Sequence, residues 1–385
     1  MTLNKNQYEV VIIGGGIVGC AASYFLAKQG VRSLILERDT VAGHSSGFAL
    51  GGLNPLGGFG IPGPLSEFSL KSFDLHTNIH SELFENTGID TEYDSHLHIT
   101  LAISDQESVA IKDKLKWQQN VSKFNVEWKS KEDILAIEPR ISPNIIGGSI
   151  IQNVATVDPY KTTLAFLMGA EKLGSQIKYT EVISVTLEKE GYYRIKTKSD
   201  NLIAEKVVFA MGPWTQFAKE WTGINIPVEP LRGQILKMNI EGPPLTYVSW
   251  GSNYIVTKSD DLIWLGTTEE RVGFNEKTTN EARKSMLDSV LSIFPYLLDA
   301  QVVGHTACLR PLSLDGLPIL GTTEKSENLI ISTGGGRKGI LYGPLMGKFT
   351  SELVTGSNID MDISMLSPDR VFEYSRESDN DPFRF

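Results

Sequence analysis

An unbroken run of apolar, mostly branched residues, Val10 to Ile13, opens the patterned part of the chain. Such a run is typical of a strand that is buried on both faces of a parallel sheet. Small and apolar residues continue from Ile17 to Gln29 and stop at Gly30, which predicts a helix with a glycine after its end. A second apolar run, Ser33 to Leu36, follows. The start of the chain therefore predicts a strand–helix–strand unit.

Helices and strands alternate through the rest of the chain. Further helices are expected over residues 65–87, 105–140 (a charged surface segment with a turn at Pro139), 158–173, 280–294 and 339–354. Further strands are expected over residues 96–103, 147–151, 177–187, 192–197, 202–210, 233–239, 247–257, 262–266, 302–309 and 329–332.

The order of these elements predicts an α/β fold with two domains. The opening unit and the glycine-rich strand–turn–helix near the end are separated by a sheet-and-helix insertion, so one domain is expected to be discontinuous. We expect a Rossmann-type nucleotide-binding domain over residues 1–90, 145–225 and 300–362. A substrate domain on a mixed, mainly antiparallel sheet is expected over residues 91–144 and 226–299, with a C-terminal tail over 363–385.

A glycine motif lies where the first strand should turn into the first helix. Gly14, Gly16 and Gly19 form G-x-G-x-x-G, in which the glycines allow a tight turn, a close approach to a pyrophosphate, and packing of helix on strand. The N–H groups at the start of the helix can bind the phosphates. Glu37, at the end of the second strand, can accept hydrogen bonds from ribose hydroxyls. Together these residues predict a dinucleotide site.

Residues 41–64 are rich in glycine, proline and serine. Large apolar residues are scattered through this segment, which indicates backbone lying close to a ligand rather than a linker. An ordinary flexible loop is the alternative interpretation.

Composition and charge narrow the class of protein. The chain has 385 residues, of which 41% are hydrophobic and 21% charged, as in an ordinary globular protein. A net charge of -10 argues against nucleic acid or an anionic membrane as partner. With two cysteines, Cys20 and Cys308, and no expected membrane span or signal peptide, we expect a cytoplasmic location. The histidines show no metal-ligand spacing, so no metal is expected.

Several motifs, taken in order, resemble the D-amino-acid oxidase superfamily of flavoproteins, specifically its glycine oxidase and sarcosine oxidase branch. The resemblance extends from about Tyr8 to Val354. Beyond the opening glycines it rests on four segments: V-V-F-A-M-G-P-W at 207–214, L-R-G-Q at 231–234, L-R-P with D-G-L-P-I-L-G at 309–321, and T-G-G-G-R-K-G-I-L at 333–341. The last segment departs from the family pattern at Gly335, where a histidine is usual.

The resemblance implies FAD as the cofactor. It implies that the flavin N5 takes a hydride from the carbon that bears the substrate nitrogen, and that water then hydrolyses the imine. Glycine, a D-amino acid, sarcosine or a proline-like imino acid is the implied substrate. The residues expected to contact FAD are Gly14, Gly16, Ile17, Val18, Glu37, Arg38, His44, Ser45, Ser46, Gly47, Val182, Ala210, Gly212, Trp214, Gly335, Gly336, Arg337, Lys338, Gly339 and Ile340.

Three residues are expected at the substrate. Arg310 would hold the substrate carboxylate through a bidentate guanidinium, and a structural ion pair is its alternative. Tyr254 resembles the tyrosine that the glycine oxidase branch places against that carboxylate, although core packing would also explain it. Arg337, with Lys338, would stabilise negative charge on the reduced flavin or give a second carboxylate contact. A solvated turn is the alternative for this pair.

Two features of the chemistry stay open at the sequence level. His44 lies in H-S-S-G, closer to relatives in which the histidine of this loop is not bonded to flavin than to those in which it is. The strand at 264–269 lacks the lysine that promotes oxygen reactivity in sarcosine oxidase, so oxygen, a quinone or another carrier is the electron acceptor. The oligomeric state is open, with a homo-oligomer as one alternative.

Two other functions compete with amine oxidation. The first is a 2-hydroxy-acid dehydrogenase of the same superfamily, which would also bind a carboxylate. The second is a flavin-binding subunit of a heteromeric dehydrogenase, which would bind FAD without turning over a substrate alone.

Overall fold

A computed structural model describes residues 6–373, which form two compact units built from interleaved segments of the chain. The first unit contains the chain up to Thr91, Asp158–Leu231, and the chain from Leu309 onward. The second contains Glu92–Val157 and Arg232–Cys308. Among the described helices, none combines the length and the apolar character that crossing a bilayer requires. The last part of the expected tail, residues 374–385, lies outside the described residues.

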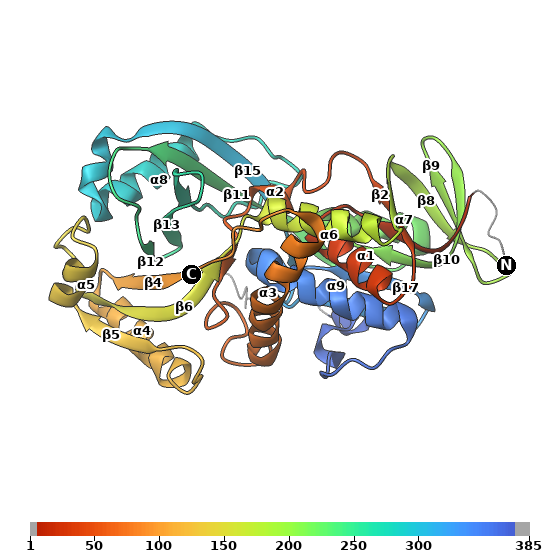
Figure 1. The fold of residues 1–385 in the computed structure, drawn as a ribbon, viewed down its shortest axis with the longest axis horizontal. Helices are drawn as coiled ribbons and strands as arrows, with labels where there is room; N and C mark the ends of the chain where they lie inside the picture. The colour runs from red at the N-terminus through yellow and green to blue at the C-terminus, as the bar shows by residue number, and fades with distance from the viewer. Residues whose placement is uncertain (1–5, 374–385) are drawn as a thin grey trace. The chain divides into compact units, whose positions relative to one another are not determined.

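A mostly parallel sheet forms the centre of the first unit (Figure 1). Its strands are β16 (Ile319–Thr323), β17 (Ser326–Thr333), β10 (Asn201–Phe209), β1 (Gln7–Ile13), β2 (Ser33–Glu37) and β7 (Gln176–Tyr179), in that spatial order. All neighbours are parallel except β16 and β17. β8 (Val182–Leu187) and β9 (Tyr193–Thr197) extend it from β10 as an antiparallel ribbon. This is the Rossmann-like arrangement that the opening pattern predicted.

Helices α1 (Ile17–Lys28) and α9 (Gly339–Thr355) lie side by side in the first unit (Figure 1). A Cβ atom at Gly343 would lie 2.5 Å from Ile17, and one at Gly347 would lie 2.6 Å from Ala21. The two glycines therefore set how closely the helices pack. The other helices of the unit are α2 (Ser45–Phe48), α3 (Ser66–Thr87), α6 (Pro159–Lys172) and α7 (Ala218–Thr222), with short 3-10 turns at Gly212–Phe217, Gly336–Lys338, Ser364–Leu366 and Pro368–Glu373. A two-residue strand, β3 (Gly52–Leu53), lies in the glycine-rich segment.

The second unit is built on a mixed, mainly antiparallel sheet. Its strands are β15 (Gln301–Ser313), β11 (Val228–Asn239), β14 (Ile263–Gly266), β13 (Asn253–Thr257), β12 (Tyr247–Trp250), β4 (Asp94–Ala102) and β6 (Gly147–Thr156), with β5 (Val126–Ser130) also on β6. β12 and β4 pair in parallel, whereas β11 with β14, β14 with β13, β13 with β12, and β6 with β4 and β5 pair antiparallel. β11 and β15 each cross the boundary between the units.

The charged segment expected to be one surface helix is different in the structure. It contains α4 (Asp105–Gln118), the strand β5, and α5 (Lys131–Ile137). Each helix begins with a capping box, at Ser104 with Glu107 and at Ser130 with Asp133. The second capping box starts a new helix after β5, so the segment forms two helices instead of one. The helix α8 (Asn280–Ile293) and a 3-10 turn at Pro295–Asp299 complete the unit.

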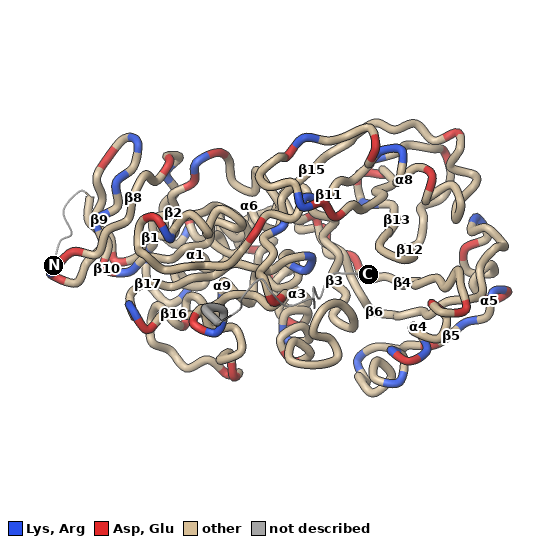
Figure 2. The backbone as a smooth tube through the Cα atoms, turned by 180° about the vertical axis from the view of Figure 1, so that it is seen from behind, with Lys and Arg blue, Asp and Glu red and all other residues tan. Residues whose placement is uncertain are grey.

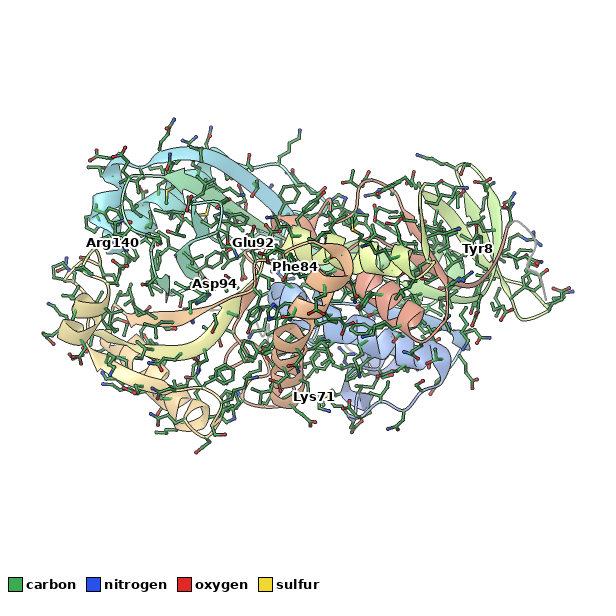
Figure 3. The ribbon with its side chains drawn as sticks, viewed as in Figure 1. Tyr8, Lys71, Phe84, Glu92, Asp94 and Arg140 are labelled. Carbon is green, nitrogen blue, oxygen red and sulfur yellow. The ribbon has the colours of Figure 1, made fainter. Side chains whose placement is uncertain are left out.

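Arg140, labelled in Figure 3, ties the segment after α5 to another part of the second unit. It makes a two-pronged ion pair with Glu138, with both N–O distances at 2.6 Å, and donates to the carbonyls of Pro243 and Pro244. Glu138 is 1% exposed and Arg140 is partly buried, so the charge of the buried carboxylate is balanced by a bidentate partner.

The domain boundaries differ in detail from those expected. Residues 145–157 and 300–308 lie in the second unit and 226–231 in the first, because β6, β11 and β15 are longer than the expected strands. Residues 363–373, expected in a tail, belong to the first unit, where Arg370 binds Asp315. In Figure 2 basic and acidic positions are interspersed along both units, so no single stretch carries the net charge of -10.

Candidate functional site

The glycine turn after β1 packs tightly against the end of β10. Gly14 has a φ of 114°, and a Cβ atom there would lie 2.3 Å from the carbonyl oxygen of Ala210. A Cβ atom at Gly19 would lie 2.1 Å from the carbonyl oxygen of Gly14. Since no side chain fits at either position, the turn presents bare backbone at the carboxyl ends of the parallel strands. This is the geometry that a dinucleotide pyrophosphate requires.

The N-terminus of α1 has no side-chain partner from within its own first turn. The cap residue, Gly16, offers no side chain, and the first turn contains no acidic residue. The N–H of Ile17 donates to Ser46 Oγ at 3.0 Å, and the N–H of Gly15 donates to Glu37 Oε2 at 2.7 Å. Val18 follows in the same helical turn. A phosphate at this position would interact favourably with the helix dipole and with free N–H groups.

Acidic, basic and aromatic side chains gather just after β2. Glu37 also accepts from the N–H of Asp39, so both of its oxygens are fixed by backbone donors. Arg38 lies over the ring of Trp214 at 5.1 Å, and His44 lies beside the same ring at 4.5 Å. His44 Nε2 is 2.9 Å from Asp39 Oδ2, and this hydrogen bond is the main cause that holds the pKa of Asp39 below its usual value. Side chains expected at FAD are thus in mutual contact.

Two neighbouring serines connect this nucleotide turn to the strand that carries Arg310. Both belong to α2: Ser46 caps the N-terminus of α1 through Ile17, whereas Ser45 Oγ donates to the carbonyl of Leu309, the residue before Arg310 in β15. Gly47 follows, and a Cβ atom there would lie 2.2 Å from the carbonyl oxygen of Ala42. α2 therefore fixes the backbone at Arg310 relative to the dinucleotide turn, inside the first unit.

A partly buried lysine joins the start of α9 to the glycine-rich segment. Lys338 Nζ donates to the carbonyl of Asn54 at 2.5 Å, and a Cβ atom at Gly58 would lie 2.6 Å from Lys338 Cε. Among the described residues no carboxylate pairs with this amine, and burial lowers the pKa of Lys338 to about 7. The residues 335–340 around it form a 3-10 turn and the first residues of α9. The carbonyl of Ile340 accepts from His76 Nε2 at 2.9 Å.

The remaining residues expected at the cofactor lie at the same ends of the parallel strands. Ala210 directly follows β10 and donates to the carbonyl of Ile13 at 2.9 Å. Gly212, with a φ of 55°, begins the 3-10 turn that carries Trp214, and its carbonyl accepts from Thr333 Oγ1. Val182 begins β8, two residues after Thr180, whose N–H donates to the carbonyl of Glu37.

Tyr254 belongs to the second unit, on β13. It pairs with Gly266 of β14, and a Cβ atom at Gly266 would lie 2.2 Å from the Tyr254 ring. The ring therefore lies flat across the backbone of the neighbouring strand rather than within the apolar core cluster of that unit, which does not include it.

Sequence reasoning missed several polar contacts. Asn54, Ser46 as a helix cap and Thr333 were not identified as partners, because each pairs with a residue far away in sequence. It also missed the ion pair between buried Arg232 and partly buried Glu270 at 2.5 Å, although Arg232 belongs to the R-G-Q segment. A polar row on β4 and β12 was missed too, and the alternation in H-L-H-I-T at 96–100 was the signal that could have revealed it.

Comparison with known proteins matches this geometry to one family. The model of the DAO family, described as FAD dependent oxidoreductase, matches residues 9–353. A glycine oxidase of Bacillus subtilis is 29% identical over 360 residues, which are 93% of this chain and 96% of that protein. The crystal structure of glycine oxidase from Geobacillus kaustophilus superposes with a TM-score of 0.91 at 27% identity, covering 96% of this chain and 100% of that one. Iminodiacetate oxidase from Chelativorans shares the fold, with a TM-score of 0.87, 22% identity, and coverage of 94% and 99% of the two chains. The chain belongs to the DAO family of FAD dependent oxidoreductases.

Proposed function

We propose that this protein oxidises the C–N bond of a small amino acid or secondary amine with FAD as its cofactor, and that water hydrolyses the resulting imine. The observation that carries the proposal is the link through α2, in which Ser46 caps the dinucleotide turn and Ser45 holds the backbone beside Arg310. A carboxylate-binding guanidinium is thereby fixed to the same scaffold as the nucleotide. The glycine oxidases among the relatives support an amino-acid substrate.

The residues present fit FAD. The bare backbone at Gly14 and the N-terminus of α1, whose first turn holds no acidic residue, suit the pyrophosphate. The carboxylate of Glu37, fixed by two N–H groups, suits the ribose hydroxyls. Backbone groups at 335–340, together with the Lys338 amine, suit the polar edge of the flavin ring. We assign the other expected contacts to the same cofactor. They are Arg38, His44, Ser45, Ser46, Gly47, Val182, Ala210, Gly212 and Trp214.

Bound FAD would supply the hydride-accepting centre of the reaction. The chain's own residues would orient the substrate and control charge. The backbone at Arg310 is held in place, because the carbonyl of the preceding Leu309 accepts a hydrogen bond from Ser45. The planar guanidinium of Arg310 can bind a carboxylate with two parallel hydrogen bonds. We assign Tyr254 to the same carboxylate. Arg337 and Lys338 would stabilise negative charge that accumulates at the cofactor, and a buried amine without a carboxylate partner suits that role.

The partners of the reaction follow from the same assignment. Oxygen, a quinone or another carrier would receive the electrons, and the segment 264–269 offers no lysine to favour oxygen. We place the protein in the cytoplasm, where buried thiols such as Cys20 stay reduced.

An anaerobic substrate panel tests the proposal. Purified yellow protein is mixed without oxygen with glycine, sarcosine, proline and the alanine enantiomers, and in parallel with lactate and glycolate. Bleaching of the flavin by an amino acid supports the proposal, whereas bleaching by hydroxy acids alone would replace it with a 2-hydroxy-acid dehydrogenase. A protein that binds FAD but is bleached only after a partner chain is added would be a subunit of a heteromeric enzyme.

Arg310 is tested in the same assay by Arg310→Ala and Arg310→Lys. Loss of a charge-assisted bidentate contact, worth about 1.5–3 kcal/mol, should raise KM about 10- to 100-fold while FAD content stays normal. Arg283→Ala is the matched control, because Arg283 is an exposed arginine on α8. Unchanged kinetics in Arg310→Ala would remove the guanidinium from the substrate site.

A further inference from the structure

The sheet of the second unit has two faces of different character. Its core face contributes the apolar residues Ile99, Leu101, Val248, Trp250 and Ile255 to a buried cluster. Because side chains alternate along a strand, the residues between them lie on the opposite face. On β4, β12 and β13 these residues are His96, His98, Thr100, Tyr247, Ser249 and Tyr254, which we call the polar face. The three strands are neighbours in the sheet (Figure 1).

A hydrogen-bonded relay runs across the polar face. His98 is paired with Tyr247 in register, Thr100 with Ser249, and Ser249 with Tyr254. His98 Nε2 is 2.9 Å from Ser249 Oγ, and Ser249 Oγ donates to Thr100 Oγ1 at 3.3 Å. A serine has only one hydroxyl proton, so His98 must donate to Ser249. The relay therefore runs from His98 through Ser249 and leaves the Thr100 hydroxyl with its proton available to an acceptor.

Aromatic rings lie next to the residues of the relay. The ring of Tyr247 lies 4.3 Å from that of His98 at an interplanar angle of 30°, and 5.5 Å from that of His96. The ring centroid of Tyr254 lies 6.4 Å from that of Tyr247, edge to face. Tyr254 and the relay are thus parts of one continuous surface.

His96 adds a second, independent sign of a ligand. Both of its ring nitrogens are buried, and neither makes a hydrogen bond with any described residue. A buried polar atom without a partner is costly, so native proteins rarely keep one without a reason. The His96 imidazole lacks a partner, and the relay beside it ends in a hydroxyl proton that is available to an acceptor. A purely structural sheet face would give both groups a hydrogen-bond partner. Their arrangement therefore indicates a binding site for a polar group.

We infer that the polar face recognises the side arm of the substrate, and that the preferred substrate is a small amino acid or secondary amine whose side arm ends in an oxygen acceptor, a carboxylate or a carboxamide. The inference rests on the proposed function, in which Tyr254 contacts the substrate carboxylate. The side arm would extend from Tyr254 toward Tyr247, and its oxygen would accept a hydrogen bond from Thr100. His96 would offer its N–H to the same group.

Isosteric substrate pairs test the inference on the FAD-loaded wild-type protein. Racemic asparagine is compared with racemic leucine, which has the same shape without the polar atoms, and glycine serves as the reference. We expect kcat/KM for asparagine to exceed that for leucine at least tenfold, as one well-made hydrogen bond to a desolvated group allows. A preference for leucine, or for glycine over both, would overturn the inference.

Variants locate the preference on the polar face. Thr100→Val and Ser249→Ala should each reduce the asparagine-to-leucine ratio at least fivefold. Ser95→Ala, at an exposed position of the same strand, is the matched control and should keep the wild-type ratio. An unchanged ratio in both Thr100→Val and Ser249→Ala, or an equal loss on all three substrates, would overturn the assignment. If either variant fails to fold, as judged by circular dichroism and FAD content, the other variant and the wild-type ratio decide.

A binding measurement separates this inference from the proposed function. Succinamate and 4-methylpentanoate are unreactive acids of similar shape, and their dissociation constants are read from the shift of the flavin spectrum. Tighter binding of succinamate, lost in Thr100→Val, would support the polar face even if no amino acid reduced the flavin. Amino-acid oxidation without any such difference would leave the proposed function standing and remove the polar face.

Discussion

Lys338 at the start of α9 donates a hydrogen bond to the carbonyl of Asn54, 284 residues earlier in the chain, at 2.5 Å. Burial lowers the pKa of this lysine to about 7. The contact joins the glycine-rich segment to α9, and no carboxylate within residues 6–373 balances the charge. Such an amine is costly to bury unless an anion accompanies it.

The stability of the apoprotein should therefore depend on pH through Lys338. The folded-state pKa of about 7 lies below the ordinary lysine pKa of 10.5, so the unfolded chain binds more protons between these values. Stability should rise as pH increases from about 7 toward 10, by at most about 1.4 kcal/mol per pH unit for this one group. Denaturant unfolding of the wild-type protein and of Lys338→Met, with FAD removed, measures the difference.

Lys338→Met should lack this component of the pH slope. Lys348→Met is the control, because Lys348 is already paired with Glu352 at 2.6 Å and should leave the slope of the wild-type protein in place. Identical slopes for the wild-type protein and Lys338→Met would show that the amine stays protonated in the folded state.

The glycine turn gives a prediction about FAD binding. At Gly14 an alanine would adopt a positive φ and also place its Cβ atom 2.3 Å from the Ala210 oxygen, so Gly14→Ala should cost about 3 kcal/mol and remove FAD. Gly30→Ala is the matched control, since Gly30 has a φ of 82° with no atom within 4 Å of the added Cβ. It should cost only about 1 kcal/mol and keep the flavin. Equal FAD content in both variants would contradict the tight-turn account.

The two serines of α2 should have separable effects. Ser46→Ala removes the cap from Ile17, so it should lower stability by about 1 kcal/mol and weaken FAD binding. Ser45→Ala releases the backbone beside Arg310, so it should raise KM for the substrate several-fold with FAD binding near normal. Flavin titration of apoprotein and steady-state kinetics measure the two effects. The assignment fails if both variants change the same quantity to the same degree.

FAD should be held without a covalent bond to His44. Its Nε2 is engaged with Asp39 at 2.9 Å, and its ring is packed beside Trp214. We therefore expect acid denaturation to release all of the flavin into the supernatant, where its absorbance is measured. Flavin that migrates with the polypeptide on a denaturing gel would show attachment, and His44→Asn would then identify the bond.

The parts of the fold that depend on local pattern could be predicted from the sequence. The strand at Val10, the glycine turn and α1 follow each other within one strand–helix unit, so their signals add. β5 could not be predicted, because Val126–Ser130 lies in a charged segment and forms a strand only by pairing with β6. β15 is also longer than the strand that the sequence pattern predicted, because its first residues are polar or exposed and give no apolar strand signal.

In the candidate site, too, residues within one contiguous motif could be predicted, whereas contacts between distant segments could not. Gly14, Glu37 and the turn around Gly336 were recognisable from motifs, because each motif is contiguous. The contact of Ser46 with Ile17 and that of Lys338 with Asn54 join segments that only the folded sheet brings together. The polar face was missed for a related reason, since His98 and Ser249 meet only through the pairing of β4 with β12.

The first unit is assembled from three stretches of chain, and this has a consequence for synthesis on the ribosome. β17 pairs with β10 and α9 packs against α1, so the sheet and helix layer of the first unit stay incomplete until nearly the whole polypeptide has emerged. The second unit has all of its segments by Cys308. We expect the inserted unit to mature first during translation, and nascent chains that stop before α9 to need protection by chaperones.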